Sequence, residues 1–130
     1  MITYRSGYKY QLRNTYKIST GIIPPYELTT RYLTLGTDGK LTIKAGYAWD
    51  GASGPAIDTQ NFMRGSLVHD ALYQLMEDKH LSHDHMEAID RLLQKLCIED
   101  GMSKMRAWWV YQGVKYGGKA KTPKYDKIAP

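Results

Sequence analysis

The chain has 130 residues, of which 42% are hydrophobic and 24% are charged, which is ordinary for one folded domain with a single core. No stretch approaches the roughly 18 consecutive apolar residues that a membrane span needs, and we expect no secretory signal because the first residues lack an apolar segment. The single cysteine, Cys97, excludes an internal disulfide, so we expect the chain to fold in a reducing cytoplasm.

The net charge of +5 is concentrated near the C-terminal end. From residue 115 onward there are five lysines and one aspartate, whereas the preceding 114 residues carry 13 basic and 12 acidic side chains. The folded body is therefore nearly neutral. The basic tail lacks arginines interleaved with aromatic residues, which argues against nucleic-acid binding. We predict a single domain over residues 1–118, followed by a basic tail over residues 119–130.

The first 48 residues have the patterns of β-structure. Residues 8–19 (YKYQLRNTYKIS) alternate bulky and polar side chains, which predicts one strand with a solvent-facing side. The adjacent prolines of GIIPPYEL predict a loop, because proline cannot join a central ladder. The segments YLTL and KLTIK flank Gly-Thr-Asp-Gly, which is a hairpin signal. Residues 45–61 are rich in Gly, Ala, Asp and Ser, which predicts a long loop.

Three helices are predicted after this loop, over about residues 62–78, 83–100 and 104–116. The expected caps and stops are Ser82, Gly101, Ser103 and the pair Gly117 and Gly118. Short connections make consecutive helices antiparallel neighbours. The predicted fold class is therefore α+β: N-terminal antiparallel strands with a hairpin, followed by three helices, of which the first two are antiparallel.

Polar residues interrupt the apolar stripes of the first two predicted helices. His69 falls within the stripe of the first helix, one turn before Tyr73, and Asp90 falls within the stripe of the second. A carboxylate in an apolar stripe is costly unless it is paired, and the antiparallel neighbour offers His69 and Tyr73 as partners. We therefore expect His69, Tyr73 and Asp90 to meet, either as catalytic residues or as a structural hydrogen-bond network.

A divalent-cation site is predicted beside this cluster. Asp70 projects from the flank of the helix, and the short side chains of the Trp-Asp-Gly-Ala-Ser loop would let backbone carbonyls approach a cation. The predicted ligands are Asp70, Asp50 and the loop backbone at Trp49 and Gly51. Such hard oxygen ligands suit Ca²⁺ or Mg²⁺ better than zinc. The alternative is that Asp50 caps a turn or the first helix.

Other reactive residues are interpreted as structural. His80, His83 and His85 match no closed zinc spacing. Cys97 lies in an apolar stripe and is expected to be a small core residue. Ser53 in GASG lacks the strand-to-helix turn of a nucleophile elbow.

Two resemblances rest on these residues. The blocks GYAWDGASGP, LVHDALY, AIDRLLQKL and WWVYQGVKYGG resemble, in this order, a family of small phage and prophage proteins that is catalogued as a domain of unknown function. The second resemblance is local and is to phospholipase A2, which carries His-Asp-x-x-Tyr on one helix and an Asp on the antiparallel helix, after a calcium-binding loop. This resemblance implies that His69 activates water, Asp90 orients His69, Tyr73 binds Asp90 and Asp70 holds Ca²⁺.

Together these resemblances imply a phage-encoded, metal-assisted hydrolase of an ester or amide bond, with phospholipid as its substrate. Two alternatives stay open. One is a hydrolase of the cell wall (peptidoglycan), and the other is a non-enzymatic virion or tail-assembly protein whose polar cluster only stabilises the helix pair. The partners expected are accordingly a phospholipid or cell-wall substrate, or other virion proteins. The expected location is the host cytoplasm on synthesis, with incorporation into the phage particle left open.

Overall fold

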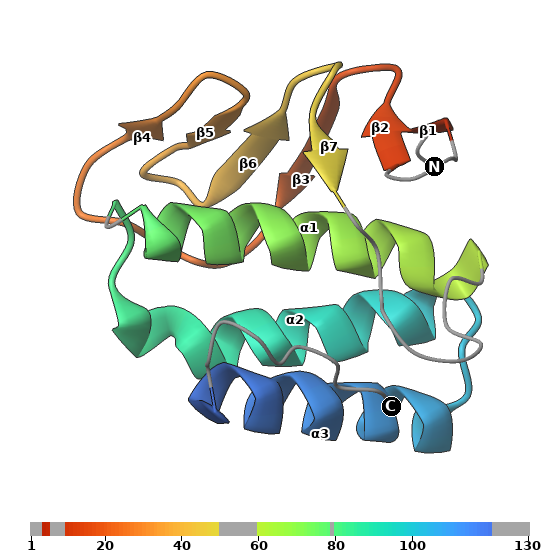
Figure 1. Ribbon diagram of the computed structural model, residues 1–130. Coiled ribbons are helices and arrows are strands. Elements are labelled where there is room, and N and C mark those ends of the chain that lie inside the picture. Colours follow the sequence, from red (N-terminus) through yellow and green to blue (C-terminus); the bar gives the residue numbers. More distant parts are fainter. Residues whose placement is uncertain (1–3, 6–9, 50–59, 79, 121–130) are drawn as a thin grey trace. The chain divides into compact units, whose positions relative to one another are not determined.

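The computed structural model describes residues 4–5, 10–49, 60–78 and 80–120 (Figure 1). Contacts between residues divide the chain into two compact units. The strand unit comprises Met1–Asp50 and Asp70–His85, and the helix unit comprises Gly51–His69 and Met86–Pro130. The order of elements, strands first and three helices afterwards, confirms the predicted α+β class.

Two antiparallel sheets belong to the strand unit. The first has the order β1-β2-β7, with β1 at Tyr4–Arg5, β2 at Tyr10–Leu12 and β7 at Ala48–Trp49. The second has the order β3-β6-β5-β4, with β3 at Tyr16–Ser19, β4 at Leu28–Thr29, β5 at Leu33–Leu35 and β6 at Lys40–Ile43. Leucine and isoleucine side chains that alternate along the central strands form the core of this unit: Leu33, Leu35, Leu41 and Ile43.

The predicted hairpin is confirmed at residues 33–43. Strands β5 and β6 pair in antiparallel register, and their connection closes through hydrogen bonds from Gly39 N to Gly36 O and from Gly36 N to Lys40 O, each 2.9 Å long. Gly39 has φ of 85°, a conformation in which a side chain would be strained. The turn needs a residue with positive φ at this position, and glycine adopts this conformation readily. The Asp-Gly signal therefore identified the turn correctly.

Two predictions about the strands are wrong. Residues 8–19 were expected to form one strand, but β2 and β3 belong to different sheets, with a bend between Leu12 and Tyr16. The alternating pattern indicates extended backbone but does not say which strand will be its partner. Residues 45–61 were expected to be loop, but β7 lies within them and pairs with β2, because Trp49 is buried against the Tyr10 ring.

The three helices occupy the predicted places. They are α1 at Gln60–Glu77, α2 at Met86–Glu99 and α3 at Lys104–Ala120, and a 3₁₀ turn, η1, at His83–His85 precedes α2. The predicted end of the third helix is wrong, because α3 continues through Gly117 and Gly118. Glycine disfavours a helix interior by only about 1 kcal/mol, so the preceding helical turns carry the helix past the pair.

Capping interactions at three of the predicted residues, Ser82, Ser103 and Gly101, fix helix ends. Ser82 Oγ accepts a hydrogen bond from Asp84 N, and Ser103 Oγ accepts one from Arg106 N at the start of α3. At the end of α2, Gly101 has φ of 105°, Gly101 N donates to Ile98 O and Met102 N donates to Cys97 O. This pair of bonds is a Schellman motif, which ends α2 at one defined residue.

The helix unit has a core between its helices. Helices α2 and α3 lie side by side (Figure 1). The core combines side chains from the first half of α1, from α2, from the connection after α2 and from α3: Phe62, Leu93, Cys97, Met102, Ala107 and Val110. Within the described part of the chain, no helix is both long and apolar enough to cross a membrane.

Candidate functional site

His69 and Asp90 form a direct polar contact inside the helix unit. His69 Nε2 lies 2.9 Å from Asp90 Oδ1, and the two residues are only 9% and 2% exposed. The sequence neighbours of Asp90 on α2 include Ile89, Leu92 and Leu93, all buried. The predicted contact between His69 and Asp90 is therefore confirmed, and it lies in an apolar environment where a carboxylate needs such a partner.

A glycine lets the two helices approach closely one turn before His69. A Cβ atom added to Gly65 would lie 2.8 Å from Leu93 Cδ1 and 3.2 Å from Cys97 Sγ. Arg64 contacts Glu99, Gly65 lies against Leu93 and Cys97, and His69 contacts Asp90. Residue numbers therefore rise along α1 as they fall along α2. The first two helices are therefore antiparallel, as predicted.

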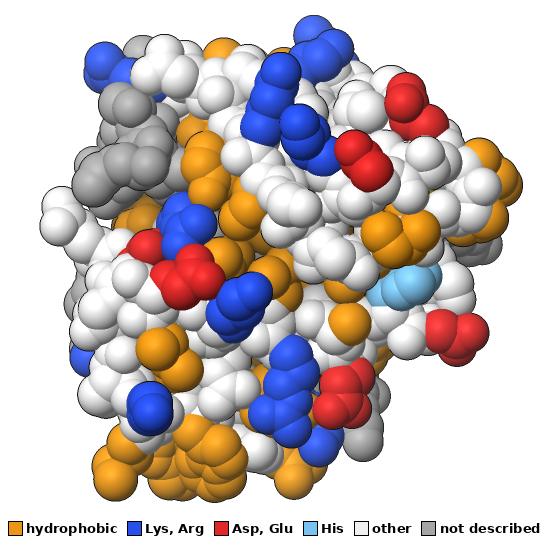
Figure 2. Space-filling view, turned by 180° about the vertical axis from the view of Figure 1, so that it is seen from behind, with side chains coloured by type: hydrophobic (Ala, Val, Ile, Leu, Met, Phe, Trp, Pro, Cys, Tyr) orange, Lys and Arg blue, Asp and Glu red, His pale blue; other side chains and the backbone are white. Residues whose placement is uncertain are grey.

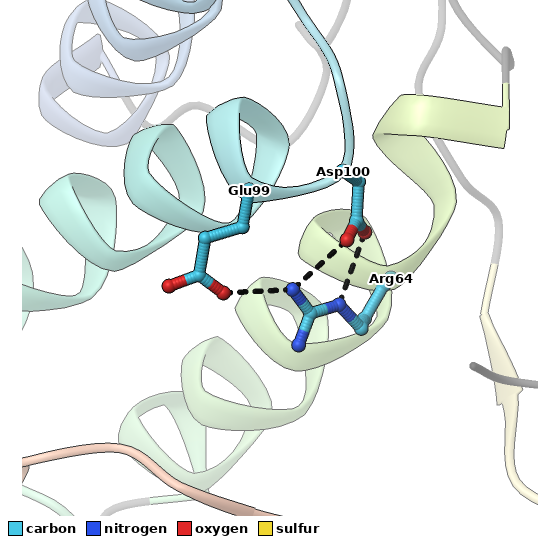
Figure 3. Close-up of polar contacts among 3 residues, drawn as sticks. All are labelled: Arg64, Glu99 and Asp100. Atoms are coloured by element: carbon cyan, nitrogen blue, oxygen red, sulfur yellow. Dashed lines mark hydrogen bonds and ion pairs between the residues drawn. The ribbon is translucent and has the colours of Figure 1, made fainter.

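Arg64 holds the beginning of α1 to the end of α2 (Figure 3). Its Nε and Nη2 atoms each donate to one carboxylate oxygen of Asp100 at 3.0 Å, and Nη2 also lies 2.9 Å from Glu99 Oε1. Paired parallel hydrogen bonds of this kind fix both distance and orientation. We infer that this ion pair keeps the two helices in the register that brings His69 to Asp90.

The sequence analysis did not identify this ion pair. Arg64 and Asp100 are 36 positions apart, and each has the charge that is ordinary for a solvent-facing helix residue. The available signal was the small size of Gly65 within an apolar stripe, which indicates a close helix contact and hence places the neighbouring Arg64 against α2.

Cys97 is a core residue, as predicted. It has no exposed surface and belongs to the core of the helix unit. Burial, together with the nearby Asp100 carboxylate, raises the pKa of the thiol to about 12. The thiolate is the nucleophilic form, so the sulfur is unsuited to nucleophilic catalysis at neutral pH.

The donor and acceptor roles in the His69–Asp90 contact depend on the tautomer of the imidazole. A neutral imidazole carries its proton on one nitrogen and a lone pair on the other. The tautomer protonated at Nε2 donates to Asp90 and has its lone pair on Nδ1. A carboxylate on one nitrogen thus orients the ring and stabilises the imidazolium that forms when the other nitrogen accepts a proton, which is the arrangement of a general base and its positioning residue.

Tyr73 and Asp70 lie on the half of α1 that belongs to the strand unit. Tyr73 is half-buried one turn after His69, and Asp70, also half-buried, directly follows His69. The expected contact between Tyr73 and Asp90 joins residues of different units, so it stays a prediction. On α1, Met63, Leu67 and Val68 are also buried.

The predicted cation ligands fall into two groups. Asp50 and Gly51 lie outside the described residues. Trp49 is buried in β7, with its ring centroid 5.6 Å from that of Tyr10, so its side chain serves packing. Among the residues that the structure describes, no three His, Cys, Asp or Glu side chains gather closely enough to hold a metal. Of the two predicted carboxylate ligands, Asp70 lies within the described residues. It is a hard oxygen donor of the kind that Ca²⁺ prefers.

Comparison with known proteins places the chain in a family. The family described as "Protein of unknown function (DUF1353)" matches residues 26–114. The chain belongs to this family. The DUF1353 match includes His69, Asp90, Arg64 and Gly65, and it begins after β3. It confirms the resemblance to a domain of unknown function, whereas phage origin and similarity to phospholipase A2 stay expectations. No curated protein and no solved structure matches the chain.

Proposed function

We propose that this DUF1353 protein is a hydrolase in which His69, positioned by Asp90, activates water for attack on an ester or amide carbonyl. The observation that carries this proposal is the 2.9 Å contact between His69 Nε2 and Asp90 Oδ1 in buried surroundings. Exclusion of water around such a pair strengthens the interaction between the carboxylate and the developing imidazolium. The helix contact at Gly65 and the Arg64 ion pair keep the ring and carboxylate in place.

The proton steps follow from the tautomer. His69 Nδ1 accepts a proton from water as the water oxygen attacks the carbonyl carbon, and the imidazolium then returns that proton to the leaving oxygen or nitrogen. Asp90 accepts the hydrogen bond from His69 Nε2 and stabilises the imidazolium. A divalent cation held by Asp70 would supply polarisation of the carbonyl oxygen. Phospholipid ester is the proposed substrate class, with peptidoglycan as the alternative.

A non-enzymatic role is the second candidate. His69 is only 9% exposed, and a histidine this deeply buried beside a carboxylate also suits a purely structural hydrogen bond. In that case the pair would specify how the helices pack, and the chain would act through its surface as a virion or tail-assembly component.

An activity screen distinguishes the two candidates. Phospholipid vesicles and purified peptidoglycan are incubated with the full chain in Ca²⁺, Mg²⁺ or EDTA, and released fatty acid or amine is quantified. The variants are His69→Gln and Asp90→Asn, and the matched control is His83→Gln, which changes an exposed histidine of η1. Circular dichroism verifies that each variant is folded.

If His69 is the general base, folded His69→Gln loses about 10²–10⁴-fold in rate, while the His83→Gln control keeps full activity. Asp90→Asn is expected to lower the rate and to keep substrate affinity. Lack of turnover of both substrates under every cation condition, or full activity of folded His69→Gln, would contradict the hydrolase and favour the structural role.

A further inference from the structure

Helix α3 exposes large hydrophobic side chains on its outer side. Trp108 and Trp109 are 46% and 55% exposed, and Met105 and Tyr116 are more exposed still. Figure 2 shows hydrophobic side chains gathered at the lower edge of the face it views, the level at which α3 lies in Figure 1, with Lys and Arg side chains nearby. Tryptophan is usually well buried, so two exposed tryptophans on one helix need an explanation.

Helical periodicity arranges these residues in two adjacent rows. Met105, Trp109 and Tyr116 occupy positions i, i+4 and i+11 and form one row. This row lies opposite the buried side of α3, which consists of Ala107, Val110 and Tyr111. The exposed side chains are therefore directed away from the core of the helix unit.

The second row combines an aromatic residue with cations. Lys104, Trp108 and Lys115 have the same spacing as the first row and lie next to it. The sequence of α3 contains four Lys or Arg residues and no Asp or Glu. The rings of Trp108 and Trp109 meet edge to face, with centroids 5.0 Å apart. The outer face of α3 is thus apolar and aromatic along one line and cationic along the neighbouring line.

We infer that this outer face of α3 binds the surface of an anionic lipid membrane, with the helix lying in the plane of the interface. Tryptophan and tyrosine favour the headgroup level because their rings are apolar and their N–H and O–H groups are polar. Lysine stems extend along the apolar surface while their ammonium groups reach lipid phosphates. Cations beside an apolar face are the combination that binds helices to anionic interfaces.

Charge and hydrophobicity argue against two other partners for this face, a second copy of this chain and a nucleic acid. A second copy of this chain docked through α3 would bring lysine rows together with no carboxylate from either α3 to neutralise them. A nucleic acid would satisfy the lysines and could stack on the tryptophans, but it would leave Met105 and the apolar row without a hydrophobic environment. An anionic bilayer satisfies both rows at once. This inference concerns a surface away from His69 and does not depend on catalysis.

Vesicle binding tests the inference directly. The full chain is sedimented with vesicles of phosphatidylglycerol and phosphatidylcholine, and with vesicles of phosphatidylcholine alone, at low and high salt. Tryptophan emission is recorded in parallel, because exposed tryptophans shift to shorter wavelength when they enter a bilayer. We expect binding to the anionic vesicles that weakens at high salt, accompanied by a blue shift.

Paired variants identify the surface. Trp108→Ser with Trp109→Ser is expected to lower the vesicle partition coefficient at least about tenfold, and Lys104→Gln with Lys115→Gln to lower it by a similar factor on anionic vesicles only. The control is Tyr26→Ser, which removes an aromatic side chain outside α3 that is even more exposed than either tryptophan and leaves binding unchanged.

Several outcomes would overturn the inference. They are absence of vesicle binding, equal binding by the tryptophan variant, dimerisation in sedimentation velocity that the tryptophan variant abolishes, and tighter binding to a short single-stranded oligonucleotide than to anionic vesicles. Because binding is measured without turnover, failure here leaves the proposed hydrolase untouched, and loss of activity in His69→Gln leaves vesicle binding intact.

Discussion

His69 on α1 and Asp90 on α2 share a buried hydrogen bond, with Nε2 and Oδ1 2.9 Å apart. Replacing Asp90 by Ala removes the acceptor and leaves the imidazole buried without it. We expect the free energy of unfolding to fall by about 2–4 kcal/mol in chemical denaturation. Asp90→Asn keeps the shape and an acceptor oxygen, so it should cost less than half as much. An Asp90→Ala variant as stable as the parent chain would show that the contact contributes nothing to folding.

Gly65→Ala should destabilise the chain although alanine favours helix. The new Cβ would lie 2.8 Å from Leu93 Cδ1, and overpacking of a core outweighs the propensity gain of about 1 kcal/mol. We expect a net loss of about 1–2 kcal/mol in thermal or chemical unfolding. Leu93→Ala removes the clashing methyl group, so the double variant should be more stable than the sum of the two single changes predicts. Simple additivity would argue against this contact.

The two carboxylates that bind Arg64 should contribute unequally. Asp100 accepts two parallel bonds from a guanidinium that is mostly buried, whereas Glu99 accepts one and its side chain is half exposed to solvent. Asp100→Asn should lower the free energy of unfolding by about 1 kcal/mol and Glu99→Gln by less than about 0.5 kcal/mol. Arg64→Lys keeps the charge but loses the two parallel N–H donors of the guanidinium. We therefore expect the free energy of unfolding in urea to fall about as much as for Asp100→Asn. The reverse order of the two carboxylates would contradict this assignment.

Stability should fall at alkaline pH because of Cys97. The folded chain holds the pKa of the thiol at about 12, against 9.0 for an ordinary thiol, so between these values the unfolded chain releases a proton that the folded chain keeps. The contribution of the protonated thiol to the free energy of unfolding is complete below pH 9 and is lost toward pH 12. The free energy of unfolding falls by at most about 1.4 kcal/mol per pH unit in this range. Cys97→Ala should be less stable at neutral pH because of a cavity, but its unfolding should show a flatter decline above pH 9. Parallel declines for the two proteins would exclude the thiol as the cause.

The basic tail should be dispensable for folding. The tail is rich in lysine and lacks apolar periodicity, and the described part of α3 is anchored by Val110 and Tyr111 well before its end. A chain that ends at Lys121 is expected to melt within about 2 °C of the full chain in differential scanning fluorimetry. A decrease of more than about 4 °C, corresponding to roughly 1 kcal/mol, would show that the removed residues pack on the body.

Local signals predicted the three helices and most of their ends, the end of α3 excepted. Ser82, Ser103 and Gly101 act on backbone groups within a few residues, so their roles can be inferred without knowing the tertiary structure. The Asp-Gly hairpin is local in the same sense. By contrast, the pairing of β2 with β7 joins residues nearly 40 positions apart, and neither strand is long enough to display a pattern of its own.

In the candidate site, too, one contact could be predicted from the sequence and another could not. The meeting of His69 and Asp90 was predictable because each interrupts an apolar stripe, and a buried carboxylate needs a partner. Arg64 and Asp100 gave no such signal, since charged residues at helix ends are ordinary in solvent. The sequence analysis did not identify the exposed row of Met105, Trp109 and Tyr116, because only the structure shows that the other side of α3 packs on the core.

The Schellman motif at Gly101 has a consequence for how this chain can vary in length. It ends α2 at a defined residue. Asp100, which directly follows α2, binds Arg64, and Asp90 within α2 binds His69. A residue inserted between Asp90 and Asp100 would rotate one anchor against the other by about 100° and lengthen the helix by about 1.5 Å. Exposed positions such as Lys95 should therefore accept substitution freely, whereas insertions and deletions between the two aspartates should not be tolerated.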